Sequence, residues 1–127
     1  MAIVGHGIDL VDIERIERMV REHGARFLER CFTPSERAYC AANPKRQVEH
    51  LAGRFAAKEA VLKALGTGWS GGIAWTDIEI VRDAAGQPGV VLSGPCLLAA
   101  QRLGVRRWLL SISHISTHAT ASAIAEG

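Results

Sequence analysis

The sequence has few cysteines, no long apolar stretch and almost no excess of charge, and each lack excludes a class of protein. Its three cysteines, Cys31, Cys40 and Cys96, form an odd set without a C-x-x-C pair, which excludes a disulfide framework or a zinc knuckle. The apolar stretches are shorter than the ~20 residues that a membrane-spanning helix needs. The N-terminal MAIVGHGIDL has no charged leader, so we expect a cytoplasmic protein without membrane contact. A net charge of +2, from 15 basic and 13 acidic residues, is too balanced for general nucleic-acid binding.

The length and the apolar content indicate a single domain over residues 1–127. With 127 residues, of which 48% are hydrophobic, the chain is long enough to bury one core but too short for a second independent domain. The apolar period changes from helical in the first half to strand-like in the second. We expect these elements: a strand over 3–11, helices over 13–30 (broken near Gly24), 34–42 and 44–65, a hairpin over 77–80 and 90–93, a helix over 94–103, and strands over 107–115 and 119–125.

The clearest local signals are the ends of two helices. Thr33, Pro34 and Glu36 form a capping box with proline at the first helical position, which predicts a helix start. Gly66 follows the last apolar residue of the long central helix and predicts its C-terminal stop.

The first strand has two unlike faces. One face carries the apolar residues Val4, Ile8 and Leu10. The other face is nearly bare, because Gly5 and Gly7 leave Asp9 as its only functional group. Glycines at these positions would let a ligand or another backbone come close. Asp9 is thus a candidate functional residue, and the alternative is that it caps the helix that follows.

Arginine and glutamate alternate over the helical region from 13 to 30. An interleaved pattern of this kind is typical of a solvated face with i,i+4 ion pairs. The sharper alternative is a docking surface for an acidic helix of a partner. The arginines concerned are Arg15, Arg18, Arg21, Arg26 and Arg30.

Glu59 is the most informative residue of the long helix, because it falls within an apolar stripe. The stripe consists of Val48, Leu51, Ala52, Phe55 and Leu62. An ionised carboxylate on an inward face needs a partner or a cation. The simple alternative is an i,i+4 ion pair between Glu59 and Lys63, and the functional alternative is a metal ligand.

Two further features have ordinary and functional interpretations. The segment GTGWSGG (66–72) has the spacing G-x-G-x-x-G, but it follows a helix and leads towards a strand, which excludes the dinucleotide-binding motif. We expect a mobile loop whose backbone N–H groups can meet phosphate oxygens.

His114 is either a histidine at the rim of the core whose hydrogen bonds are made within the protein, or a ligand contact where its strand leaves the core.

Asp9 and Glu59 together suggest a magnesium site. Magnesium takes one or two protein carboxylates and completes its shell with water and substrate phosphate oxygens. The basic residues Arg54, Lys58 and Lys63 on the long helix would supply a phosphate clamp. The residues alone therefore suggest a metal-assisted reaction on a phosphate-bearing small molecule.

Several segments resemble one enzyme family in order along the chain. They are GIDLVDIERIERM (7–19), FTPSE (32–36), LAGRFAAKEAVLKALGTG (51–68), DIEI (77–80) and SISH (111–114). The sequence is similar in these segments to the small holo-acyl-carrier-protein synthases, and the central segment is the most specific. The resemblance implies a magnesium-dependent phosphopantetheinyl transferase that uses coenzyme A and acts on an acyl carrier protein. It also implies an α+β fold, with a small antiparallel sheet packed against a long central helix and shorter helices, assembled as a homotrimer with coenzyme A between subunits.

The resemblance also assigns roles to residues. Asp9 and Glu59 match the magnesium ligands, and with Lys63 they form the expected catalytic set. The general base is left open between Glu59 and a water at the metal. The coenzyme A contacts match Arg54, Lys58, Lys63, Gly66, Thr67, Gly68 and His114. The carrier-docking positions match Arg15, Met19, Arg26, Phe27 and Arg30.

Part of the chain does not match the family pattern, and two other functions stay open. The segment 21–25 and the residues Trp69 and Trp75 have no place on the motifs. Another magnesium-dependent phosphate-ester enzyme would share the carboxylates but would not need the arginine-rich helix. A non-enzymatic module that binds coenzyme A or a carrier protein would need no metal.

Overall fold

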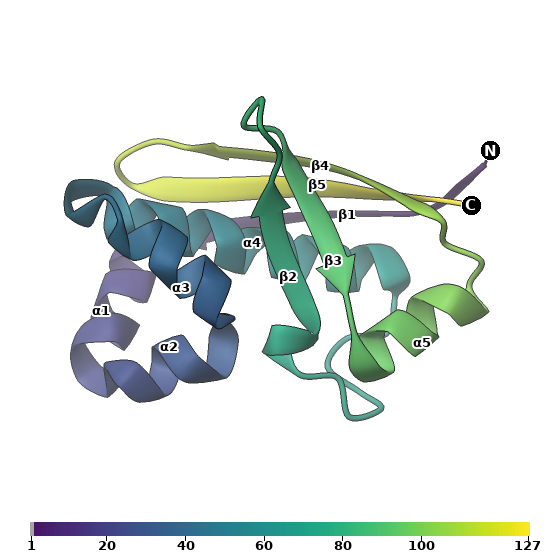
Figure 1. The fold of residues 1–127 in the computed structure, drawn as a ribbon, viewed down its shortest axis with the longest axis horizontal. Helices are drawn as coiled ribbons and strands as arrows, with labels where there is room; N and C mark the ends of the chain where they lie inside the picture. The colour runs from purple at the N-terminus through teal and green to yellow at the C-terminus, as the bar shows by residue number, and fades with distance from the viewer. Residues whose placement is uncertain (1) are drawn as a thin grey trace.

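The computed structural model describes residues 2–127, and its elements follow the predicted order. Figure 1 shows a long helix beneath a three-stranded sheet, with a hairpin crossing in front and shorter helices at the sides. The elements are β1 (Ile3–Asp12), α1 (Ile13–His23), α2 (Ala25–Cys31), α3 (Pro34–Ala41), the 3₁₀ turn η1 (Pro44–Arg46), α4 (Gln47–Leu65), the 3₁₀ turn η2 (Trp75–Asp77), β2 (Ile78–Arg82), β3 (Pro88–Leu92), α5 (Gly94–Arg102), β4 (Arg107–His114) and β5 (His118–Glu126).

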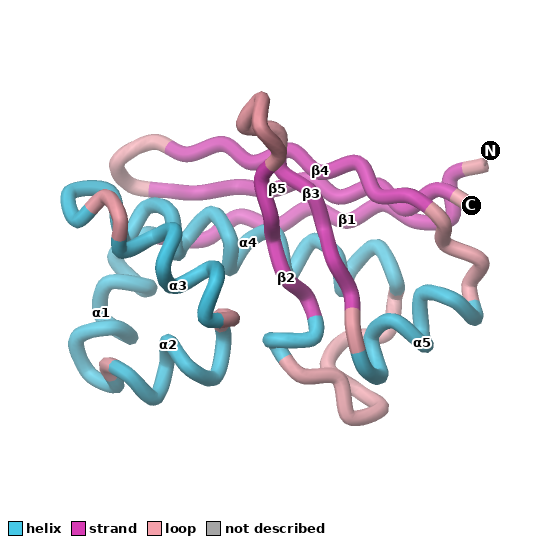
Figure 2. The backbone as a smooth tube through the Cα atoms, in the orientation of Figure 1, coloured by secondary structure: helices cyan, strands magenta, loops and turns pink. Residues whose placement is uncertain are grey.

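The strands form two antiparallel sheets. β5 lies between β1 and β4 in the larger sheet, whereas β2 and β3 pair only with each other. Figure 2 shows the two sheets as separate groups of strands, with the first and last strands of the chain side by side. In the β1–β5 register Asp9 lies opposite Ala121, near the end of the strand where α1 begins. The α+β class predicted from the sequence is confirmed.

The glycine face of β1 packs directly on the backbone of α4. A Cβ atom added to Gly5 or Gly7 would overlap the carbonyl oxygen of Ala64 or Ala60 respectively. The glycines thus admit another backbone, which is one of the two possibilities that the sequence left open. The opposite face of β1, with Ile8 and the other apolar residues, is exposed in the single chain.

Three local predictions about helix ends are confirmed. Thr33 Oγ1 accepts a hydrogen bond from the Glu36 N–H, and the Glu36 side chain accepts one from the Thr33 N–H. Gly24 has a φ of 51° and separates α1 from α2. Gly66 ends α4 in the left-handed conformation, and its N–H donates to the Leu62 carbonyl.

Two local predictions are wrong. The alternative that Asp9 caps the first helix fails, because the Asp12 side chain accepts the hydrogen bond from the Glu14 N–H. The long helix begins at Gln47 and not at Pro44, because residues 44–46 form a 3₁₀ turn before it. Neither difference moves a candidate functional residue.

The core lies between α4 and the neighbouring elements, and α4 is enclosed on nearly all sides. Its buried positions include Arg54 and Lys58 as well as its apolar residues. None of the helices over residues 2–127 is both long enough and apolar enough to span a bilayer. Because α4 meets the sheet, the hairpin and the N-terminal helices, residues a few positions apart on it reach different parts of the molecule.

Candidate active site

Asp9 and Lys63 form an ion pair at the contact between β1 and α4. Lys63 Nζ lies 3.0 Å from Asp9 Oδ1 and also donates to the Ile8 carbonyl oxygen at 3.0 Å. The Asp9 side chain is 17% exposed, and that of Lys63 is 54% exposed. The expected alternative, an ion pair between Lys63 and Glu59, is wrong, because Lys63 reaches across to the strand.

Glu59 lies next to this pair and has no cation of its own. Burial and the neighbouring Asp9 carboxylate raise the pKa of Glu59, while a hydrogen bond from the Trp69 side chain and the charges of Lys63 and Arg15 lower it by less. A half-buried carboxylate beside a second carboxylate is destabilised unless a cation joins the two. The arrangement therefore favours a bound cation between β1 and α4.

Asp9 and Glu59 fit magnesium better than a softer metal. The set has only carboxylate oxygens, and residues 2–127 contain no cluster of three or more histidine, cysteine or acidic side chains that would enclose a metal. Magnesium suits such a site, because it binds through one or two carboxylates and leaves positions for substrate phosphate oxygens. The two residues would hold magnesium and leave one side of it to a ligand.

The loop over residues 66–72 follows α4, and its residue Trp69 lies near Glu59. Gly66, Gly68, Gly71 and Gly72 all have positive φ, so the loop has conformations that only glycine adopts readily. Its internal hydrogen bonds run from Thr67 Oγ1 to the Gly68 carbonyl oxygen and from Ser70 Oγ to the Thr67 carbonyl oxygen. No hydrogen bond of the loop fixes the Gly68 N–H, which stays free to meet a phosphate.

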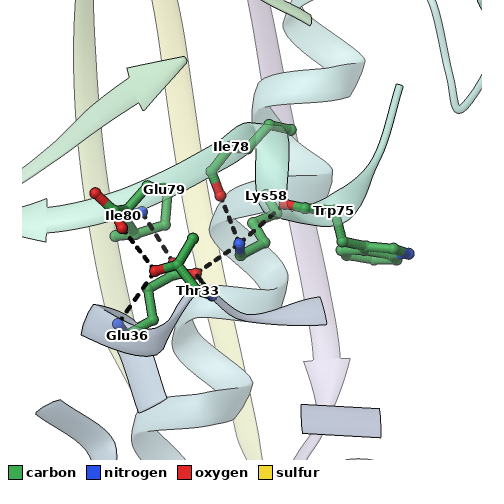
Figure 3. A network of polar contacts seen from close by, with 7 residues as sticks. All are labelled: Thr33, Glu36, Lys58, Trp75, Ile78, Glu79 and Ile80. Atoms are coloured by element: carbon green, nitrogen blue, oxygen red, sulfur yellow. Dashed lines mark hydrogen bonds and ion pairs between the residues drawn. The ribbon is translucent and has the colours of Figure 1, made fainter. Parts of the chain in front are cut away.

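The structure contradicts the expected contact between Lys58 and coenzyme A. The Lys58 side chain is fully buried, and its ammonium group donates to Glu36 Oε1 and to the carbonyl oxygens of Trp75 and Ile78 (Figure 3). An ammonium group has three N–H donors, and all three are used here. Lys58 has no donor left for a phosphate group, although it directly precedes Glu59.

Arg54 and His114 lie away from the carboxylates. Successive helical residues are rotated by about 100°, so Arg54 and Glu59 point about 140° apart around α4. The Arg54 guanidinium lies 4.0 Å from the centre of the Tyr39 ring, and its Nε has no hydrogen-bond partner. His114 Nδ1 lies 3.1 Å from Glu49 Oε2.

A cleft of about 430 Å³ opens at His114, and its lining has more basic than acidic residues. It is lined by Lys45, Arg46, Glu49, His114, Ile115 and Ser116. The single chain therefore has two separate groups of predicted ligand contacts. Arg54 and His114, which both lie near His50, form one group, and Lys63 with residues 66–68 forms the other.

A second groove, of about 470 Å³, brings together all five predicted carrier-docking residues. It is lined by Arg15, Met19, His23, Arg26, Phe27, Arg30, Cys31, Phe55 and Trp75. Its apolar residues Phe27, Cys31 and Phe55 are buried, whereas its three arginines are exposed. The Arg15 guanidinium lies 5.5 Å from the centre of the Phe55 ring and also acts on the charge of Glu59. The groove residue Phe55 lies one helical turn before Glu59 on α4, so the groove is next to the carboxylate pair.

Phe55 and Trp75 are groove residues that the sequence did not assign to a site. Phe55 belongs to the apolar stripe and was placed with the core, whereas Trp75 matched no motif. Their rings stack with centres 4.6 Å apart, and the Trp69 ring lies 4.0 Å from that of Trp75. The tryptophans that follow the long helix, in and after the glycine-rich segment, were the available sequence signal for this aromatic side of the groove.

Comparisons with known proteins agree with the resemblance seen in the sequence. The family model of the 4′-phosphopantetheinyl transferase superfamily matches residues 5–122. The chain is 50% identical to the holo-[acyl-carrier-protein] synthase of Protochlamydia amoebophila, covering 95% of this chain and 96% of the relative. It is 47% identical to that of Koribacter versatilis, covering 98% of each chain.

Solved structures of such proteins have the same fold. The holo-[acyl-carrier-protein] synthase of Neisseria meningitidis has a TM-score of 0.88 and 38% identity, covering 99% of this chain and 100% of the other. That of Helicobacter pylori, solved with coenzyme A, has a TM-score of 0.83 and 34% identity, covering 95% and 99%. From the family model and these relatives together, the chain belongs to the 4′-phosphopantetheinyl transferase superfamily, among the holo-[acyl-carrier-protein] synthases.

Proposed function

We propose that this protein transfers the 4′-phosphopantetheine group of coenzyme A to a serine of an apo-acyl carrier protein. The products are the holo-carrier and adenosine 3′,5′-bisphosphate. The observation that carries the proposal is the position of the Asp9–Glu59 carboxylate pair beside an arginine-lined groove, whose residue Phe55 lies one helical turn before Glu59. The names of the relatives and the coenzyme A complex of one of them support the same reaction.

The reaction requires magnesium held by Asp9 and Glu59. Bound there, the cation supplies charge neutralisation at the pyrophosphate under attack. The serine oxygen forms a new bond to the β-phosphorus, and the bond from that phosphorus to the bridging oxygen breaks, so adenosine bisphosphate takes the bonding pair. The serine proton passes either to Glu59 or to a water molecule, and Lys63 stabilises the charge that develops on the phosphate oxygens.

Coenzyme A binding uses Arg54, His114, Lys63 and the turn of Gly66, Thr67 and Gly68. Because Arg54 and Lys63 lie on different sides of α4, one chain does not gather these groups around one ligand. A homotrimer would bring one group of contacts of one subunit beside the other group of its neighbour. The exposed apolar residues of β1 supply a surface for that assembly, and they include Ile3, Val4, Ile8 and Leu10.

The carrier protein docks in the groove beside α1 and α2. Three arginines and a half-buried methionine surround an apolar floor there, which suits a partner helix with acidic and apolar faces. The carrier serine would then lie at the end of the groove next to Phe55, one helical turn before Glu59. We further propose that residues 1–127 form one domain and that the protein works in the cytoplasm.

The intact mass of an apo-acyl carrier protein, measured after incubation with this protein, coenzyme A and magnesium, tests the function. We expect the carrier to gain one phosphopantetheine, and we expect Glu59→Gln or a chelator to abolish the gain. Glu126→Gln is the matched control, because Glu126 is on β5 away from the site and pairs only loosely with Arg107, at 3.6 Å. If several carriers gain no mass while the protein binds coenzyme A, the non-enzymatic binding module becomes the better assignment.

A further inference from the structure

Lys58 and Glu36 form a buried ion pair whose role the reaction described above does not assign. Lys58 Nζ lies 2.7 Å from Glu36 Oε1 and 3.0 Å from the Trp75 carbonyl oxygen, and both side chains are fully buried. A buried charge of this kind is costly unless it is paired and fully hydrogen-bonded, and here it is both. Each N–H donor of the Lys58 ammonium group therefore has an acceptor within the protein, and the burial of the pair does not require a bound ligand.

Glu36 uses its remaining acceptor capacity to join three elements. Its Oε1 also accepts from the Thr33 N–H, and its Oε2 accepts from the Ile80 N–H, each at 2.9 Å. Thr33 Oγ1 in turn donates to Glu79 Oε2 at 2.6 Å. Figure 3 shows that the network ties the start of α3 to α4 and to β2. The segment with Trp75 thus has a fixed position relative to α4.

The fixed segment carries an aromatic wall that ends at Glu59. The Trp75 ring stacks on Phe55 of α4, and the Trp69 ring packs on Trp75 from the glycine-rich loop. The Trp69 side chain also comes close to Glu59 and lowers the pKa of its carboxyl group. Contacts therefore run from the Lys58 ammonium through the Trp75 backbone to both indole rings, and Trp69 at their end lies near the Glu59 carboxylate.

We propose that Lys58 is a positioning residue, which fixes the Trp75 carbonyl and thereby holds the Trp69–Trp75 pair as a wall against Glu59 and the carrier groove. The inference rests on the proposed transfer reaction and adds to it a role for a residue that contacts no reactant. Lys58 and Glu59 are adjacent in sequence but point about 100° apart, so the same turn of α4 fixes the wall on one side and presents the carboxylate on the other.

The first test is spectroscopic and needs no turnover. The chain has three tryptophans, so a Trp108→Phe background leaves only the pair in contact. Two indoles this close give an exciton couplet in circular dichroism, and we expect Lys58→Met to abolish it while the helical signal stays. We expect the affinity for coenzyme A, measured by calorimetry, to change less than about twofold, because Lys58 does not contact the ligand and independent sites affect each other by no more than this. A retained couplet, or a large loss of coenzyme A affinity, would overturn the proposal.

The second test is kinetic and uses a variant that keeps the ion pair. Displacement of a positioned group by about 1 Å can cost about 100-fold in rate, so we expect Lys58→Met and Trp75→Leu each to lower kcat/KM for the carrier about 10- to 100-fold. The double variant should be no slower than Trp75→Leu alone, because both changes remove the same wall. Additive losses would show that Lys58 acts by another route.

A matched control and a folding check complete the design. Arg107→Met removes a positive charge from β4 outside the groove and both ligand-contact groups, and we expect the couplet and the kinetics to stay unchanged. If Lys58→Met does not fold, Trp75→Leu and Trp69→Leu decide the matter, because unchanged carrier kinetics in both would overturn the proposal. If the wild type transfers nothing, the proposed function fails, whereas the couplet still decides the positioning role.

Discussion

Lys63 Nζ lies 3.0 Å from Asp9 Oδ1, so the lysine of α4 neutralises the carboxylate of β1 and leaves Glu59, one turn earlier on its own helix, without an ion pair. The two acidic residues are therefore unequal in the absence of a metal. Asp9 has a cation beside it, whereas burial and Asp9 itself raise the pKa of Glu59. This inequality leads to the first two predictions.

We expect Lys63→Met to lower kcat/KM for phosphopantetheine transfer about 100-fold, which is typical for the loss of one group that stabilises transition-state charge. The fold should persist, because the Lys63 side chain is 54% exposed. Steady-state transfer to an apo-carrier, with circular dichroism as the check on folding, measures the effect. The control Arg107→Met loses the same charge outside the site. Equal rates in the two variants would show that Lys63 has no role in the reaction.

The raised pKa of Glu59 predicts how magnesium stabilises the protein as the pH changes. The protonated form is favoured in the folded state, so the stability contributed by this shift is present at low pH and is lost as the pH rises through the raised pKa. If Glu59 is a magnesium ligand as proposed, the metal binds only the ionised carboxylate, so its stabilising effect should grow over the same range and fall as the pH decreases.

Melting temperatures with and without magnesium, measured between about pH 5 and pH 8, test this dependence, since the pKa of Glu59 is raised from 4.5. The difference should be largest at the alkaline end and should shrink towards the acidic end. Glu59→Gln should show little magnesium effect at any pH. A constant magnesium effect in the wild type across this range would contradict the assignment of Glu59 as a ligand.

The close approach of β1 to α4 predicts an unusually large effect of one methyl group. In Gly7→Ala the new Cβ would overlap the Ala60 carbonyl oxygen, so the strand or the helix must move. We expect the free energy of unfolding to fall by about 3 kcal/mol or more, at the upper end for overpacking. Gly89→Ala is the control, because its Cβ would meet Val81 Cγ2 at an ordinary 3.4 Å. Urea denaturation of both variants measures the difference, and equal stabilities would show that the contact is looser than described.

A charge reversal in the arginine-lined groove should weaken binding of the carrier protein and leave binding of coenzyme A unchanged. Arg26→Glu should raise KM for the apo-carrier about tenfold, because it replaces attraction for an acidic helix by repulsion, and added salt should reduce the effect. KM for coenzyme A should stay the same, since Arg26 lines the groove and neither ligand-contact group. Transfer assays with each substrate varied in turn measure both constants. A parallel rise in KM for coenzyme A would show that the groove is not specific to the carrier.

The exposed face of β1 predicts the effect of a charge on assembly. Ile8 is 60% exposed in the single chain, and its neighbours on this face, Val4 and Leu10, are also apolar and exposed. An apolar face of this kind is suited to contact with another subunit. If the face lies between subunits, Ile8→Asp should convert a trimer into monomers and lower the affinity for coenzyme A at the same time. Light scattering gives the molar mass and calorimetry gives the affinity. A trimeric variant, or a wild-type monomer that binds coenzyme A fully, would place the interface elsewhere or remove it.

Local signals in the sequence predicted helix ends and strands well. The capping box at Thr33 and the glycine at position 66 act over a few residues, so the sequence around them contains all that is needed. The pairing of β1 with β5 was not predicted, because their contact joins the two ends of the chain. A strand pattern alone does not specify its neighbours.

The partners of charged residues on α4 were predicted less well, for a physical reason. Helical periodicity places Lys58 and Glu59 relative to an apolar stripe, but this helix is covered on nearly all sides and the stripe is only one of its buried faces. Lys58 therefore has a buried partner on α3, and Lys63 has one on β1. Partners 22 and 54 residues away in sequence lie beyond any local pattern.

The two glycines of β1 determine how the carboxylates are spaced. Where side chains separate two elements, core substitutions shift one element relative to the other by fractions of an ångström. Between β1 and α4 only main-chain atoms meet at Gly5 and Gly7, and neither element can slide by one residue without a collision. The separation of Asp9 and Glu59 is thus determined by backbone contact. Mutations elsewhere in the core should lower the amount of folded protein while each folded molecule keeps the same spacing of the two carboxylates.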